Sequence, residues 1–208
     1  MADSVADEAV HPEPERLEAR GLVDLVLHLE LEHLEARDPV DPALHGGGAP
    51  RGAGPGAATL GTPNETSQRS EKDVMNVLEM IRKEFNVDEN RTYLMGHSMG
   101  GAGAIYIGVK YASIWAAVGA EAPATAPAGL NPNNYPLEPA KNVPMIIVQG
   151  DMDTLVPVAG TRLWIDKMKS LNMTYQYVEV PGGDHGSVLT TGAPDIFAFF
   201  AKHSKTAR

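Results

Sequence analysis

The chain has no cysteine and few positively charged residues, and these two shortages exclude several kinds of protein. Among its 208 residues, 17 are Lys or Arg and 27 are Asp or Glu, which gives a formal net charge of −10. Without cysteine there can be no disulfide framework, no thiolate nucleophile and no cysteine-based zinc site. The acidic surplus also argues against binding to nucleic acid or to an anionic membrane, because both require clustered Lys and Arg.

Long apolar runs are missing as well. No stretch of about 18 apolar residues occurs, so the sequence predicts no membrane span. The first residues, MADSVADEAVHPEPER, are acidic and lack the apolar core of a secretory signal, which leaves the cytoplasm as the default location. Hydrophobic residues still make up 43% of the chain, enough for one domain with a core of its own.

The first third of the chain is poor in the residue types that build a core. Its first 71 residues contain no Lys, Ile, Phe, Tyr or Trp. One apolar stretch, GLVDLVLHLEL at 21–31, alternates as in a half-buried strand, but its flanks have the composition of a helix. Seven Gly and five Pro at 39–63 predict an irregular segment. We therefore expect an atypical N-terminal segment, 1–69, followed by a globular portion, 70–208.

From residue 70 onward, short apolar runs alternate with helical patterns. Ser70 and Asp73 resemble the capped start of a helix, and Val74, Val77, Leu78, Ile81 and Phe85 follow at helical spacing as one buried face. The pattern predicts helices at 70–85, 99–112, 157–171 and 194–203, and strands at 91–96, 114–120, 143–150 and 175–180. This alternation is typical of the α/β class: a mostly parallel sheet with helices on both faces and its site at the carboxyl ends of the strands.

The segment LMGHSMGGAGA, 94–104, places a serine between two glycines where a predicted strand meets a predicted helix. Gly96 and Gly100 leave room for a sharp turn, and Gly101 lets the helix approach the strand closely. The G-x-S-x-G pattern in this context is a nucleophile elbow, with Ser98 exposed at its apex. The main-chain N–H of Met99, at the start of the helix, is then placed to bind an oxyanion.

A serine hydroxyl becomes a good nucleophile when a histidine takes its proton and a carboxylate orients that histidine. His185 follows the last predicted strand, in the glycine-rich loop VPGGDHG. Asp151 and Asp153 both follow the strand at 143–150, and spacing alone does not choose between them. Asp184 is adjacent to His185 and is badly placed to orient its ring.

These motifs, YLMGHSMGGAGAI, MIIVQGDMDTLVPV and VPGGDHG, make residues 70–208 resemble the C-terminal half of an α/β-hydrolase. The resemblance is to esterases of the polyhydroxybutyrate-depolymerase, feruloyl-esterase and prolyl-oligopeptidase-like groups. It implies an α/β-hydrolase fold, and its G-x-x-D-x-x-V-P pattern, laid on Gly150 to Pro157, selects Asp153 as the acid. The order serine, aspartate, histidine is also that of the family.

The resemblance further implies a second oxyanion donor from a loop that precedes the elbow. LHGGGAP, 44–50, looks like the HGGG motif that supplies it, through Gly46 and Gly47; the alternative is a glycine-rich linker. The implied activity is hydrolysis of small or medium acyl or aryl esters, with no metal or organic cofactor. A peptidase of the prolyl-oligopeptidase type would share these motifs, and a defective, non-catalytic fragment would keep them. Neither a nucleic-acid nor a membrane partner is expected, and the oligomeric state stays open.

Overall fold

Five parallel strands form the sheet, side by side in the order in which they occur in the chain. The structure is a computed structural model that describes residues 23–30 and 65–205. The strands are β1 (Val23–Glu30), β2 (Val87–His97), β3 (Ala117–Glu121), β4 (Met145–Gly150) and β5 (Tyr175–Val180). The helices are α1 (Glu65–Glu84), α2 (Met99–Lys110), α3 (Val158–Ser170) and α4 (Val188–Ala201), with a short 3₁₀ helix, η1, at Glu138–Ala140.

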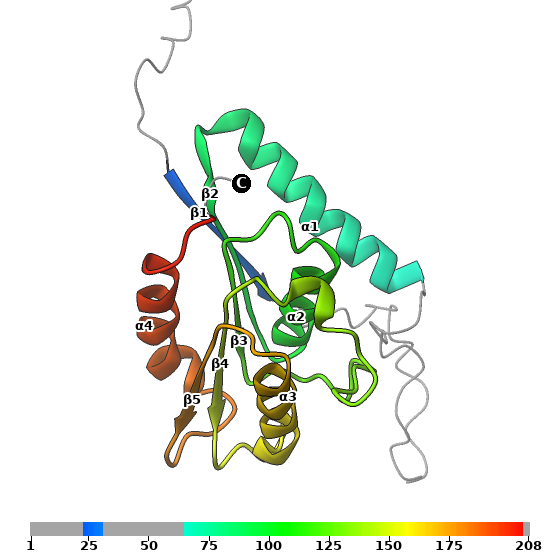
Figure 1. Ribbon diagram of the computed structural model, residues 1–208, viewed down its shortest axis with the longest axis vertical. Helices are drawn as coiled ribbons and strands as arrows, with labels where there is room; N and C mark the ends of the chain where they lie inside the picture. The colour runs from blue at the N-terminus through cyan, green and yellow to red at the C-terminus, as the bar shows by residue number, and fades with distance from the viewer. Residues whose placement is uncertain (1–22, 31–64, 206–208) are drawn as a thin grey trace, which may run out of the picture.

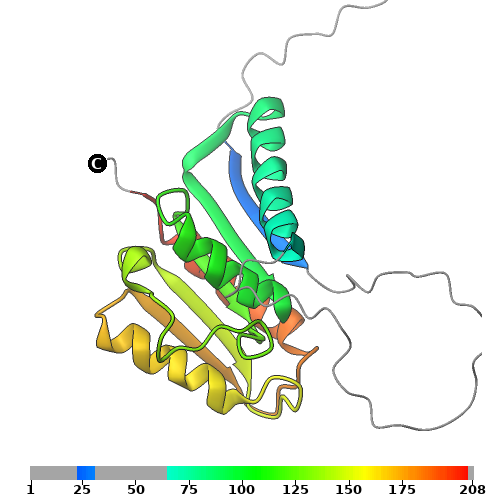
Figure 2. The same cartoon turned by 90° about the vertical axis from the view of Figure 1, so that its right-hand side faces the viewer.

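Helices cover both faces of the sheet, as the α/β pattern predicts. Figures 1 and 2 show α4 on one side and α1, α2 and α3 on the other. In β4, Met145 and Ile147 pack in the cluster that includes Trp164 of α3, whereas Ile146 and Val148 pack in the cluster around α4. A strand buried on both faces needs a continuous apolar run, and β4 has one.

Residues 23–30 of the alternating stretch form a strand, so the β interpretation holds for the described part of that ambiguous segment. β1 pairs in parallel with β2, and the register sets Leu27 opposite Leu94 and Glu30 opposite His97. The sheet therefore contains one strand from the N-terminal segment, and α1 spans the expected boundary at residues 69 and 70. The irregular segment predicted at 39–63 lies outside the described residues, and the organisation of the N-terminal segment as a whole stays a prediction.

Two details of the first helix were predicted wrongly. α1 begins at Glu65, so Ser70 lies inside the helix and does not cap it. Residues 65–69 contain neither Gly nor Pro, and nothing in the sequence stops the helix from extending back to them. The buried face is also narrower than predicted, because Val77 is 40% exposed and Phe85 is 47% exposed.

Two other element starts also lie earlier than predicted. α4 begins at Val188, six residues before Pro194, which lies inside the helix. Val188 is fully buried against the sheet, and this packing holds the first turns in helical form although Pro194 cannot donate a hydrogen bond. β2 begins at Val87, four residues before the predicted start at residue 91, and Val87 pairs with Val23 of β1.

Candidate active site

Ser98 lies between the end of β2 and the start of α2, with a backbone conformation that L-residues rarely adopt (φ 55°, ψ −119°). Three main-chain hydrogen bonds hold it there. Its N–H donates to the carbonyl of Glu121 on β3, and its own carbonyl accepts the N–H groups of Ala102 and Ala124. The turn therefore places the side chain at the carboxyl end of the sheet, as the elbow pattern predicts.

Gly101 makes this turn possible by bringing α2 close to the strand ends. A Cβ atom at this position would lie 2.8 Å from the main-chain oxygen of Glu121 and 3.1 Å from that of Gly96. Both neighbours are backbone atoms and cannot rotate away. Close approach of the helix to the elbow thus requires glycine, as expected from the sequence.

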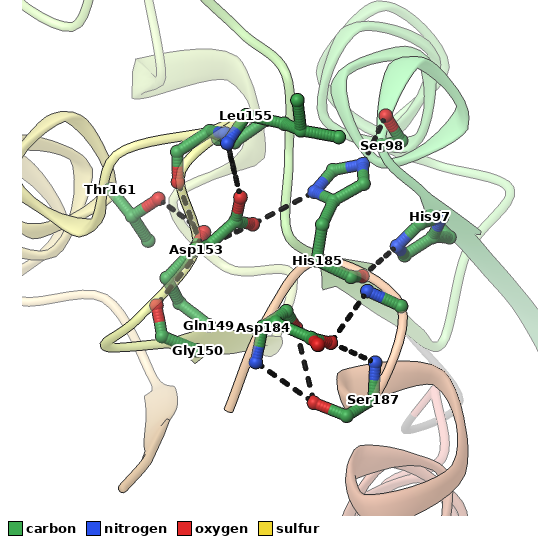
Figure 3. A network of polar contacts seen from close by, with 12 residues as sticks. His97, Ser98, Gln149, Gly150, Asp153, Leu155, Thr161, Asp184, His185 and Ser187 are labelled. Atoms are coloured by element: carbon green, nitrogen blue, oxygen red, sulfur yellow. Dashed lines mark hydrogen bonds and ion pairs between the residues drawn. The ribbon is translucent and has the colours of Figure 1, made fainter. Parts of the chain in front are cut away.

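His185, on the loop between β5 and α4, lies between Ser98 and Asp153 (Figure 3). Its Nε2 is 2.9 Å from Oγ of Ser98, and its Nδ1 is 2.8 Å from Oδ2 of Asp153. A carboxylate oxygen only accepts, so Nδ1 carries the proton and Nε2 of the neutral ring accepts the serine O–H. The hydroxyl, the imidazole and the carboxylate thus form one continuous hydrogen-bonded chain.

Asp153 is completely buried through its side chain and is surrounded by donors. Burial alone would raise the pKa of its carboxyl, but the N–H of Val156, the His185 ring and the N–H of Leu155 outweigh burial and lower the pKa below its ordinary value. The two main-chain donors lie 2.8 and 2.9 Å from Oδ1. Asp153 therefore stays ionised next to His185.

A buried glutamine extends this network and was not predicted from the sequence. Gln149, the penultimate residue of β4, is 0% exposed and donates from Nε2 to Oδ2 of Asp153 at 3.0 Å. Its Oε1 accepts the hydroxyl of Thr161 on α3 at 2.8 Å. The signal in the sequence was a single amide inside the apolar run MIIVQG, because a buried polar side chain needs partners.

The two other candidate acids form no hydrogen bond with His185 through their carboxylates, and each stabilises a loop instead. Asp151 accepts the N–H of Gly182 at 2.6 Å. Asp184 turns back on its own loop and accepts the N–H groups of Gly186 and Ser187. Of the carboxylates considered, only that of Asp153 meets the imidazole.

The loops that carry Asp153 and His185 contact each other directly. A Cβ atom on Gly150 would lie 2.2 Å from the carbonyl oxygen of Gly183, a distance that only glycine allows. The same carbonyl accepts the N–H of Met152 at 3.0 Å. The ends of β4 and β5 are thus joined backbone to backbone, which fixes the spacing of Asp153 and His185.

One of the predicted oxyanion donors lies at this site. Met99 is the first residue of α2, and N–H groups in the first turn of a helix have no acceptor within the helix. Its N–H follows Ser98 directly and lies at the positive end of the helix dipole. Gly46 and Gly47 lie outside the described residues, so the source of the second donor stays a prediction.

Two buried polar residues beside the elbow were not predicted to have a role. Glu121, the last residue of β3, is 1% exposed, and within the described part of the chain its Oε1 has no hydrogen-bond partner. Burial raises the pKa of Glu121 to about 7. In the adjacent strand, His97 is 5% exposed and hydrogen bonds to the main chain of His185. The sequence signal for Glu121 was a charged residue at the end of the apolar run AVGAE.

None of the helices within 65–205 is long and apolar enough to cross a membrane. Over the same part of the chain, no group of three or more His, Asp or Glu side chains is arranged to hold a metal ion.

The strand order, the strained serine and the histidine–aspartate pair define an α/β-hydrolase fold, and solved structures share it. A thermostable esterase is 23% identical with a TM-score of 0.57, covering 66% of this chain and 37% of that one. SOBER1 from Arabidopsis thaliana is 18% identical with a TM-score of 0.52, covering 70% and 69%. An acylaminoacyl peptidase from Pyrococcus horikoshii is 17% identical with a TM-score of 0.53, covering 67% and 28%.

Sequence comparison supplies the family. The model of the Esterase family matches residues 65–187, more than half of the chain. The chain therefore belongs to the Esterase family, and the resemblance to α/β-hydrolase esterases inferred from its motifs is confirmed. No curated protein matches it. The chain spans about a third of the length of the thermostable esterase and about two thirds of that of SOBER1.

Proposed function

We propose that the chain is a serine carboxylic-ester hydrolase that works through an acyl-enzyme. The observation that carries the proposal is the position of His185, which hydrogen bonds to Ser98 on one side and Asp153 on the other. Membership of the Esterase family supports the same activity. In this proposal Ser98 is the nucleophile, His185 the general base and acid, and Asp153 the residue that orients His185.

The first half of the reaction forms the acyl-enzyme. Oγ of Ser98 attacks the ester carbonyl carbon while Nε2 of His185 takes the hydroxyl proton. The carbonyl oxygen becomes an oxyanion, which the N–H of Met99 binds, with Gly46 and Gly47 as the proposed source of a second donor. The imidazolium formed at His185 is stabilised by ionised Asp153. As the intermediate collapses, the alcohol leaves with the proton from His185.

The second half repeats these steps with water. His185 takes a proton from a water molecule, and the resulting hydroxide attacks the acyl carbonyl carbon. Collapse of the second intermediate breaks the bond to Oγ, returns the proton from His185 to Ser98 and releases the carboxylic acid. All proton transfers pass through one ring nitrogen, so no metal or organic cofactor is needed.

The proposed substrates are small or medium acyl or aryl esters. The side chains of Met152 and Leu155 flank Asp153 and are 64% and 71% exposed. Exposed apolar side chains in the loop that carries Asp153 favour substrates with an apolar acyl or alcohol group over substrates with a charged one. A peptidase would use the same three residues, so the leaving group must be tested directly.

The test combines a covalent probe with two substrates. A fluorophosphonate probe should label the full chain at Ser98, and the variant Ser98→Ala should stay unlabelled. Hydrolysis of p-nitrophenyl butyrate should exceed hydrolysis of a prolyl p-nitroanilide by at least about a hundredfold in kcat/KM, a difference of about 2.7 kcal/mol. Faster cleavage of the anilide would instead favour the peptidase. Folded protein that the probe does not label would be the defective fragment, and the enzyme proposal would fail.

A further inference from the structure

His97 precedes the nucleophile in the sequence, yet its side chain lies on the other side of the elbow. Tyr93 and Met95, at alternate positions of the same strand, belong to the cluster packed against α4. His97 continues that row and is 5% exposed. In Figure 3 its ring points away from the Ser98 hydroxyl and toward the main chain of His185.

The contact is a hydrogen bond to the carbonyl of the histidine proposed as the base. Nε2 of His97 lies 2.8 Å from the main-chain oxygen of His185. A carbonyl oxygen only accepts, so Nε2 of His97 must carry a proton and donate it to the bond. The two imidazole rings are also in contact, with centroids 4.7 Å apart and planes inclined by 52°.

His185 is therefore fixed at three points. Its Nε2 meets Ser98, its Nδ1 meets Asp153, and its main-chain carbonyl meets His97. Two of these three partners are consecutive residues of the elbow. The end of β2, which leads into Ser98, thus also holds the backbone of His185, although His97 and His185 are 88 positions apart in the sequence.

We propose that His97 is a positioning residue, which acts through the carbonyl of His185 to set the height of the imidazole above Ser98. The hydrogen bonds at Gly182, Gly183 and Gly186 hold the loop on either side of His185, whereas the bond from His97 is made to the carbonyl of His185 itself. The bond from His97 is partly buried, and losing its donor is costly for the acceptor left behind. This inference rests on the proposed hydrolase function for its kinetic readout.

Three substitutions separate positioning from simple packing. His97→Gln places an amide N–H near the original Nε2, His97→Asn is too short to reach, and His97→Leu has no donor. A displacement of about 1 Å costs on the order of a hundredfold in rate. We expect kcat on p-nitrophenyl butyrate to fall about 10–100-fold in the Asn and Leu variants with little change in KM, and to recover to within about fivefold of wild type in the Gln variant.

His203 offers a matched control. Its ring nitrogen Nδ1 lies 2.8 Å from the main-chain oxygen of Phe199, and its ring packs on the Phe199 ring. It therefore makes the same kind of contact at the far end of α4. His203→Leu should lower the free energy of unfolding and leave kcat unchanged. If His97→Leu behaves like His203→Leu, or if the Gln and Leu variants lose equal activity, the inference is overturned.

A spectroscopic readout on wild-type protein keeps the inference testable even if the variants do not fold. In ¹⁵N-histidine-labelled wild-type protein, the inference requires Nε2 of His97 to be protonated, and finding that nitrogen unprotonated would overturn it. The Nδ1–H resonance of His185 should be sharp in wild type and in His97→Gln, and shifted or broadened in His97→Asn. These signals do not depend on turnover. Wild-type protein without esterase activity or probe labelling would overturn the proposed function alone.

Discussion

The carboxylate of Asp151 accepts the main-chain N–H of Gly182 at 2.6 Å, and so joins the loop after β4 to the loop that carries His185. Asp151 lies two residues before Asp153, and the two side chains perform different tasks in the same loop. Asp151 holds the loop that carries His185, and Asp153 hydrogen bonds to the His185 ring. Sequence spacing alone could not divide these tasks, because both residues follow the same strand.

Substitutions at the two aspartates should therefore differ strongly. Asp153→Asn removes the charge that orients and stabilises His185, and we expect kcat to fall by about 10⁴-fold. Asp151→Asn keeps an oxygen that can accept from Gly182 and should stay within a few-fold of wild type, whereas Asp151→Ala should cost about 1 kcal/mol of stability. Steady-state kinetics and urea unfolding measure both effects. Equal losses of kcat in the two Asn variants would contradict this assignment.

The polar chain behind Asp153 predicts a stability effect far from the reacting atoms. Thr161→Val removes the hydroxyl that donates to Oε1 of Gln149 and leaves that oxygen buried without this partner. We expect the free energy of unfolding to fall by about 1–3 kcal/mol. Thr161→Ser keeps the hydroxyl and should lose clearly less. If the two variants unfold at the same urea concentration, the hydrogen bond contributes little.

Gly101 predicts a combined loss of stability and activity. In Gly101→Ala the new methyl group would press against the carbonyls of Glu121 and Gly96, so α2 must move away from the elbow. We expect a cost of about 1–3 kcal/mol and a lower kcat. Gly160→Ala is the control: it lies in α3 with nothing within 4 Å of its Cβ position, and it should gain up to about 1 kcal/mol. A fully active Gly101→Ala variant would show that the close approach is not required.

Buried Glu121 predicts a stability that decreases as the pH rises. Its pKa is about 7 in the folded chain, and the ordinary value is 4.5. Between these values the folded protein keeps a proton that the unfolded chain has lost. The contribution of Glu121 to stability is therefore largest below about pH 4.5, decreases toward pH 7 and then levels off, by about 3 kcal/mol in all. In Glu121→Gln this decrease should be absent.

The measurement is urea unfolding of wild type and Glu121→Gln between pH 5 and 8. The difference in unfolding free energy between variant and wild type should grow as the pH rises. Glu179→Gln provides a control of opposite sign, because the hydrogen bond from Arg162 lowers the pKa of Glu179. Its contribution is complete above the ordinary value of 4.5, so its difference should stay constant over this range. A constant difference for Glu121→Gln as well would contradict the prediction.

Much of the fold could be predicted from local pattern because the elements after residue 90 have strong periodicity. The strand at 175–180 was placed to the residue, and the helix at 157–171 to within one residue at each end. Element starts failed where a local signal competed with packing. Ser70 resembles a cap inside a helix that nothing stops, and Pro194 resembles a first residue in a helix whose earlier turns are held by burial.

The geometry of the site could likewise be predicted from the sequence only in part. The elbow at Ser98 is encoded in contiguous residues, so its form could be predicted. The bond between His97 and His185 joins residues 88 positions apart and involves a main-chain carbonyl, for which the sequence carries no residue-specific signal. The partners of Gln149, and the lack of a partner for Oε1 of Glu121 among the described residues, likewise depend on which strands and helices become neighbours.

The positive φ of Ser98 has a consequence for how such a protein can change over evolutionary time. Glycine adopts this conformation more easily than any residue with a side chain, so Ser98→Gly would relax the backbone while removing the proposed nucleophile. Selection for thermal robustness alone would thus favour losing the serine. Ser98 is thus a position where selection for turnover opposes selection for stability, and an inactive descendant of this chain should drift toward glycine there first.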